Sequence, residues 1–272
     1  IPSKGAIRDT YDIRTYQFAP RGMFDWTAGF DIENKLGFKL TPKDQGGSYS
    51  CGGQAWSYYM EVLEALATGN YEPRSARWIY APVRAPGGGS MGKELSSFVV
   101  KNGSALEKDA LSYENGKAPT EAFMSQIPVL KDSTAKGIAE DSRALSYIQV
   151  KANIDTIAQA IQDNNGCCIA FYFENNGTMR TEFIKPPINQ TYAHWVYCGK
   201  VKMINGKKHI GFINSWGKRT GKDGWQWMSE DYFVNGNVWY GWTLAWDYKP
   251  AKIKLALKEV VRLLQALYLL KK

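Results

Sequence analysis

The stretch DQGGSYSCGGQAWSYYMEVLEAL, residues 44–66, leads into the first strong helix of the chain. Apolar residues at helical spacing predict a helix from about Ala55 to Ala67, which Gly69 would cap. Its apolar face should consist of Tyr58, Val62, Ala65 and Leu66. A glycine-rich turn before a helix is a suitable setting for a nucleophile, yet the residue before Trp56 is alanine.

The rest of the chain changes from a helical period to a strand period. Helices are predicted near 91–101 and over 153–166, followed by strand-like segments at 167–173, 193–204, 207–216, 224–233 and 241–248. The Asn-Gly pair at 205–206 predicts a hairpin. Helices first and antiparallel strands second indicate an α+β protein, with a helical lobe, a sheet lobe and a cleft between them.

Charge and composition exclude two classes of protein. The 37 aromatic residues among 272 argue against disorder and for a packed core. The net charge is +8, but residues 249–272 carry +6 of it, which leaves +2 for the body. A nucleic-acid function therefore has little support.

The four cysteines do not form a metal-ligand pattern or a disulfide framework. Cys167 and Cys168 are adjacent in an apolar strand, so their side chains should point to opposite faces. Together with Cys198 they are expected to be buried free thiols. No metal and no cofactor are expected.

Two polar residues gain meaning from their order. His194 lies at the start of an apolar strand, and Asn214 follows twenty residues later in NSWG. Each alone would be structural, and His209 beside the hairpin is expected to be solvated. Together with residues 44–56, the chain contains Q-G-x-x-x-x-C-G-G-Q-A-W, then A-H-W, then N-S-W-G.

This order resembles the papain-like cysteine peptidase family over about residues 23–248. The resemblance implies a papain-like two-lobed fold, with a helical lobe over about 45–150 and a β lobe, a sheet or barrel, over about 151–248. It also implies peptide or protein substrates and no cofactor, and it slightly favours a secreted or vesicular, lysosome-like location.

The family pattern implies a role for each matching residue. Residue 55 would be the nucleophile position, His194 its ion-pair partner and general acid, and Asn214 the residue that orients His194. Gln45 would complete the oxyanion hole with the backbone N–H of residue 55. The residues implied in substrate binding are Gly88 and Gly89, which would present backbone to an extended peptide, Ala170 and Trp195 as pocket walls, and Trp216 as a shield.

The sequence departs from the family pattern at the nucleophile. Ala55 has no thiol, so the resemblance implies a peptidase inactivated by a change from cysteine to alanine. Cys51 lies four residues earlier and matches a structural half-cystine, whose usual partner would fall near Ala85 or Pro86. Neither is cysteine, so Cys51 is a free thiol or pairs elsewhere. The spacing from Gln45 to Cys51 is three residues longer than this alignment requires.

The two ends of the chain lie outside the resemblance. Residues 1–22 are interpreted as a pro-segment remnant or an arm packed on the body, because family zymogens use such segments to cover the cleft. Residues 249–272 predict a basic amphipathic helix that packs on the body, lies on a membrane surface or binds a partner protein.

The function predicted from sequence is thus a silenced cysteine endopeptidase. Two alternatives remain open: a natural pseudoenzyme that binds extended peptides, and a transpeptidase that uses the same residues.

Overall fold

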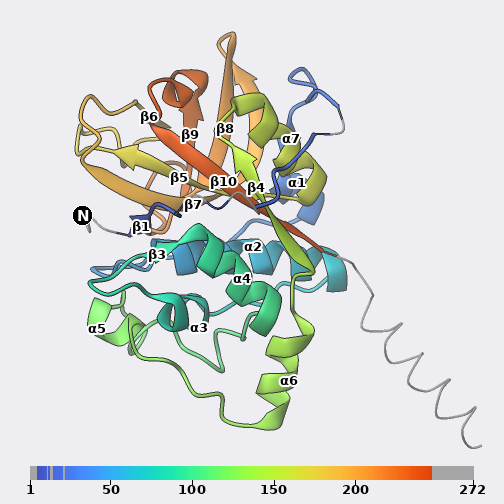
Figure 1. The fold of residues 1–272 in the computed structure, drawn as a ribbon, viewed down its shortest axis with the longest axis vertical. Helices are drawn as coiled ribbons and strands as arrows, with labels where there is room; N and C mark the ends of the chain where they lie inside the picture. Colours follow the sequence, from blue (N-terminus) through green and yellow to red (C-terminus); the bar gives the residue numbers. More distant parts are fainter. Residues whose placement is uncertain (1–4, 11, 13–14, 21, 247–272) are drawn as a thin grey trace, which may run out of the picture.

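A computed structural model describes residues 5–10, 12, 15–20 and 22–246. Its helices are α1 (Ile32–Leu36), α2 (Cys51–Thr68), α3 (Ala76–Tyr80), α4 (Gly92–Asn102), α5 (Glu121–Met124), α6 (Ser133–Asp141) and α7 (Ile154–Asn164). Its strands are β1 (Ala6–Ile7), β2 (Phe30–Asp31), β3 (Ser90–Met91), β4 (Ser146–Lys151), β5 (Cys167–Phe173), β6 (Phe183–Ile184), β7 (Tyr192–Ile204), β8 (Lys207–Ile213), β9 (Trp225–Ser229) and β10 (Val238–Ala245). The expected α+β, two-lobed fold is confirmed, with α2–α6 in one lobe and the large sheet with α7 in the other (Figure 1).

The sheet of the β lobe runs in the order β4-β10-β5-β7-β8-β9-β6, and β2 pairs with the far part of β7. Its pairs are antiparallel, as predicted, except that β6 runs parallel to β9. The predicted hairpin joins β7 to β8, because Ile204 pairs with Lys207 across a two-residue turn. Asn205 and Gly206 both have positive φ there, as a type I′ turn requires.

Helix α2 differs from its prediction at its start and in its burial. It begins at Cys51, four residues before the predicted start at Ala55, and ends at Thr68 with Gly69 as its left-handed cap. Fifteen of its eighteen residues are buried, so it has no solvated face of the kind that an amphipathic helix shows. The reason is its position, since it contacts both the helices α3 and α4 and the strand β7.

The sheet separates two hydrophobic cores. One lies between the sheet and α2 and contains Cys168, and the other lies between the sheet and α7 and contains Cys167 and Cys198. The adjacent cysteines therefore face opposite sides, as the strand period predicts. All three are buried free thiols, which confirms that expectation.

Some predicted features lie outside the described residues. The amphipathic helix predicted for residues 249–272 is one of them, and so are residues 1–4 of the N-terminal segment. Among the helices that the structure describes, none combines the length and the apolar character that a membrane span requires.

Candidate active site

The first residue of α2 is a cysteine. Cys51 is fully buried, and its Sγ accepts a weak hydrogen bond from the backbone N–H of Trp195 at 3.5 Å. The backbone N–H groups of Gly52 and of Cys51 itself also act on the sulfur, and they favour its thiolate. Burial outweighs these donors and raises the pKa of the Cys51 thiol to about 12.

The structure differs from the sequence prediction in which residue lies at the helix N-terminus. The sequence interpretation put residue 55 at the helix N-terminus, whereas the structure places Ala55 one turn inside α2, in the hydrophobic core. Cys51 occupies the N-terminal position instead, and it is a free thiol. The first turn of a helix is where backbone N–H groups lack intrahelical partners. The chain therefore has a thiol sulfur, that of Cys51, at the helix N-terminus.

His194 lies on β7, directly before the residue whose N–H contacts Cys51. Its Nε2 is 3.0 Å from Oδ1 of Asn214, the residue after β8. The same Oδ1 accepts from the backbone N–H of Ser215 at 2.7 Å, and Nδ2 of Asn214 donates to Oε1 of Gln226 at 2.7 Å. This network fixes the Asn214 amide, so Nε2 of His194 must carry the proton and Nδ1 is left basic.

The surroundings of His194 are aromatic. The ring of Trp216 lies against it, with centroids 4.7 Å apart and an interplanar angle of 31°. Phe171 and Phe173 approach it edge-on. Burial lowers the pKa of His194 to about 4, although the bond to Asn214 acts to raise it. His194 and Cys51 are therefore both neutral near pH 7 in this conformation.

Gln45 is buried beside this network. Its Oε1 accepts from the Ser215 hydroxyl at 2.6 Å, and its Nε2 donates to the carbonyl of Ser48 at 2.8 Å. The side-chain amide expected to serve an oxyanion hole is thus engaged with its own loop here.

A buried ion pair connects the loop before α2 to the helix. Lys43 Nζ lies 2.6 Å from Glu61 Oε1, and both side chains are less than 10% exposed. Glu61 also accepts from the backbone N–H of Arg74 at 2.7 Å. Lys43 in turn donates to the hydroxyl of Ser57. The loop that carries Gln45 is therefore held at a fixed position relative to the start of α2.

The residues predicted to contact substrate fall into two groups. Gly88 and Gly89 form a turn with φ of 98° and 80°, directly before β3. Ala170 and Trp195 pair across β5 and β7, and both are fully buried core residues rather than walls of an open pocket. Trp195 packs edge-on against Trp56 and donates its indole N–H to the Ser90 carbonyl.

The N-terminal segment covers the Cys51 thiol. Strand β1 pairs in parallel with β3, and the backbone N–H of Ser90 donates to the Gly5 carbonyl at 3.1 Å. A Cβ on Gly5 would overlap the Cys51 sulfur, so Gly5 lies directly against it. We call residues 5–12 the arm, of which residue 11 lies outside the described residues.

The far end of the arm is fixed by Asp9. Its carboxylate accepts from the backbone N–H of Lys93 at 3.0 Å and from the indole N–H of Trp242 at 2.9 Å. Asp12 adds an ion pair with Lys93 at 2.8 Å. The covered state therefore rests on specific polar contacts at the end of the arm that is remote from Cys51.

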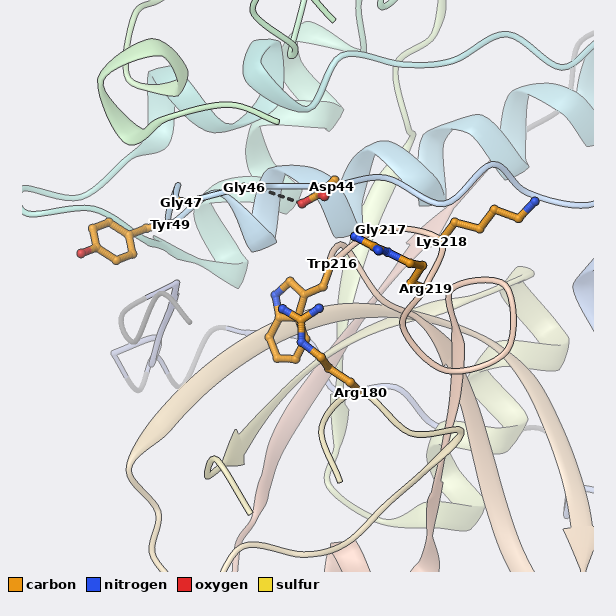
Figure 2. Close-up of a pocket in the computed structure, with 9 residues that line it drawn as sticks. All are labelled: Asp44, Gly46, Gly47, Tyr49, Arg180, Trp216, Gly217, Lys218 and Arg219. Atoms are coloured by element: carbon orange, nitrogen blue, oxygen red, sulfur yellow. Dashed lines mark hydrogen bonds between the residues drawn. The ribbon is translucent and has the colours of Figure 1, made fainter. Parts of the chain in front are cut away.

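An open pocket of about 610 Å³ lies next to Trp216 (Figure 2). The loop of residues 44–49 forms one wall, and residues 216–219 with Arg180 form the other. No group of three His, Cys, Asp or Glu residues in the described part of the chain could hold a metal ion.

No protein-family model matches the sequence, and no curated protein matches it either. Solved structures do match it. Xylellain, a cysteine protease from Xylella fastidiosa, is 20% identical with a TM-score of 0.74, covering 90% of this chain and 97% of that one. The chain has the papain-like fold. Procathepsin L2 from the larval midgut of Tenebrio molitor (17% identical, TM-score 0.71) covers 90% of this chain and 78% of its own. Bromelain from Ananas comosus, solved with the E64 inhibitor, is 19% identical with a TM-score of 0.61, and the match covers 80% of this chain and 99% of the bromelain chain.

Two residues of the arrangement described above are not among the site residues predicted from the sequence. The sequence pattern favours a structural role for Cys51 because Trp56 directly follows Ala55, although Ser48 and Ser50 are typical residues before a helix N-terminus. Gln226 carries no sequence signal beyond its place in a Trp-rich strand. Only the register of β8 with β9, which pairs Phe212 with Gln226, brings it beside Asn214.

Proposed function

We propose that this chain is a cysteine peptidase of the papain-like kind, that Cys51 is its nucleophile, and that the arm holds it in a covered state. The observation that carries the proposal is the Cys51 thiol at the first residue of α2, bonded to the N–H of the residue after His194. The fold, which is that of several cysteine proteases, supports the same class of chemistry.

The proposed reaction uses the site residues as follows. His194 takes the proton of Cys51 at Nδ1, and the thiolate attacks the carbonyl carbon of the scissile peptide bond. The C–N bond then breaks as His194 returns that proton to the departing amine. Water hydrolyses the resulting thioester, again with His194 as the base, and frees the Cys51 thiol. Asn214 keeps the imidazole in the tautomer that each of these transfers needs.

The helix N-terminus supplies the electrostatic part of the proposal. A developing oxyanion near Cys51 would be stabilised by backbone N–H groups that have no intrahelical partner. Gln45 could add its side-chain amide after breaking its bond to the Ser48 carbonyl. This reassignment means that Ala55 does not silence the chain.

The arm explains why the ion pair is not formed in this conformation. Gly5 lies against the sulfur, and the thiol is fully buried. Removing the arm would admit water to Cys51, and the cost of its negative charge would fall. The covered conformation is therefore proposed to be the inactive one, as a pro-segment would produce.

The test is labelling by a thiol-directed epoxide together with cleavage of a peptide library. We expect the chain to react at Cys51 and to cleave peptides once the arm is displaced, and Cys51→Ser to do neither. The decisive control is the double variant Cys51→Ser/Ala55→Cys. Activity of the double variant with none in the wild-type chain would restore residue 55 as the nucleophile position.

A further inference from the structure

The pocket beside Trp216 has an uneven distribution of charge. Three cationic side chains line it, from Arg180, Lys218 and Arg219, against one carboxylate, Asp44. Asp44 already accepts from the backbone N–H of Gly46 at 2.9 Å. Among the described residues, neither Arg180 nor Arg219 takes part in an ion pair or a side-chain hydrogen bond that would neutralise it.

The two arginines share an orientation that the lysine does not. Figure 2 shows the side chains of Arg180 and Arg219 extending toward Trp216, while Lys218 extends away from it. Arginine presents a planar fork of N–H donors, which matches the geometry of a carboxylate. The indole N–H of Trp216 is also buried without a hydrogen-bond partner.

The loops that carry these side chains are held by defined contacts. Gln226 Nε2 donates to the carbonyls of Met179 and Thr181, on either side of Arg180. The Arg180 carbonyl itself accepts from the backbone N–H of Gly221 at 2.9 Å. The loop bearing Arg219 is closed by Thr220, whose hydroxyl donates to the Trp216 carbonyl at 2.9 Å. The arginines therefore start from fixed backbone positions.

The position of the pocket decides which part of a substrate would reach it. The arm occupies the β3 side of Cys51. The pocket lies on the side of Trp216, whose ring packs against His194. Because the leaving amine must receive its proton from the general acid, the chain that follows the scissile bond departs past His194.

We propose that this pocket binds a carboxylate in the leaving portion of the substrate, through Arg180 and Arg219. The carboxylate comes from an Asp or Glu side chain or from the α-carboxylate of a peptide C-terminus. That the carboxylate belongs to the leaving portion of the substrate rests on the proposed function. That the pocket binds a carboxylate does not.

Equilibrium binding tests the proposal without any need for catalysis. The protein is the full chain with Cys51→Ser, in which the pocket remains open beside the docked arm. Three N-acetylated tripeptides are titrated and followed by NMR: Gly-Asp-Gly amide, Gly-Asn-Gly amide and Gly-Asn-Gly as the free acid. We expect the carboxylate-bearing peptides to bind about fivefold more tightly than the neutral one at low salt, from two partly screened charge pairs. The preference should shrink in 0.5 M NaCl.

Matched charge variants locate the effect. Arg180→Glu/Arg219→Glu should abolish or invert the preference, and Arg180→Gln/Arg219→Gln should remove it. Lys101→Glu/Lys136→Glu carries the same change of net charge as the first variant, yet should retain most of the preference, since both lysines are exposed residues of α4 and α6 and do not line the pocket.

The comparison between the two acidic peptides identifies the source of the carboxylate. A preference for Gly-Asp-Gly amide indicates an acidic side chain, and one for the free acid indicates a C-terminus. Equal binding of all three peptides, or a preference that survives the arginine substitutions, overturns the proposal. The proposed function fails separately, if the chain with its arm displaced is neither labelled at Cys51 nor cleaves any peptide.

Discussion

Nε2 of His194 faces Oδ1 of Asn214 at 3.0 Å, and this contact leaves Nδ1 as the basic nitrogen of the ring. The amide that imposes this tautomer is itself fixed, because its Nδ2 donates to Gln226. The nitrogen that is proposed to take the proton of Cys51 is thus set by a chain of two side-chain amides.

Removing the amide should lower the reaction rate without unfolding the protein. We expect Asn214→Ala to reduce kcat by about tenfold to a hundredfold, as the loss of one buried hydrogen bond to the imidazole implies. Gln226→Ala should have a smaller effect in the same direction. Gln159→Ala, a buried amide on α7, is the control and should leave kcat unchanged. A loss of kcat in that variant would point to a general structural defect.

Displacing the arm should expose the Cys51 thiol. In Gly5→Leu the new side chain would overlap the sulfur, so the arm could no longer lie against it. With the pKa of Cys51 at about 12 in the covered state, against an ordinary value of 9.0, the thiolate is about a thousandfold scarcer. We therefore expect Gly5→Leu to raise the rate of alkylation by iodoacetamide at pH 8 by a large factor.

The control for the arm is another glycine. A Cβ on Gly22 would meet no atom within 4 Å, so Gly22→Leu should leave the alkylation rate at the wild-type value. If Gly5→Leu is alkylated as slowly as the wild-type chain, the arm does not protect the thiol.

Acid should destabilise the folded chain through His194. Burial lowers its pKa from 6.5 to about 4, so the unfolded chain binds more protons than the folded one between these values. Above pH 6.5 the imidazole is neutral in both states and the free energy of unfolding is unaffected. As the pH falls from 6.5 toward 4, protonation of His194 in the unfolded chain lowers the free energy of unfolding by about 3 kcal/mol at most. Urea unfolding of wild type and His194→Gln measures it. The free energy of unfolding should fall more steeply with acid in the wild type, and parallel curves would contradict the assignment.

The buried ion pair between Lys43 and Glu61 should contribute strongly to the stability of the fold. Glu61→Ala leaves the Lys43 ammonium buried without its carboxylate, and also removes the acceptor for the Arg74 backbone. Breaking one side of a buried pair costs about 3–5 kcal/mol. Thermal unfolding of Glu61→Ala should show this loss. Glu72→Ala, in an exposed pair with Lys108, should stay within about 1 kcal/mol of wild type.

The sequence predicted the meeting of His194 and Asn214 but not the start of α2. The pair is predictable because the family pattern assigns the two residues to each other, and because an Asn-Gly turn joins β7, which carries His194, to β8, which Asn214 directly follows. The start of α2 at Cys51 is not predictable, since Gly52 and Gly53 are poor helix formers and argue for a later start. Tertiary packing reverses this preference: a Cβ on Gly53 would lie 2.5 Å from the Ala76 carbonyl and 2.6 Å from the Cβ of Tyr80. Glycine at that point lets α3 approach α2.

The sequence predicts an N-terminal arm, but neither the strand pairing that docks it nor the pocket. The pairing of β1 with β3 joins residues more than eighty positions apart, and no local pattern in residues 5–9 specifies it. The approach of Arg180 to Trp216 depends on how a long loop folds back over β9, which the alternation of a strand does not encode.

The double attachment of Gln226 limits how this protein can be re-engineered. One side of its amide sets the Asn214 side chain, and the other bonds the carbonyls that flank Arg180. Grafting a different loop in place of residues 178–182 would therefore also disturb the imidazole. Selectivity and proton transfer are not separable modules in this scaffold, and a transplanted loop must keep both carbonyl acceptors to leave the chemistry intact.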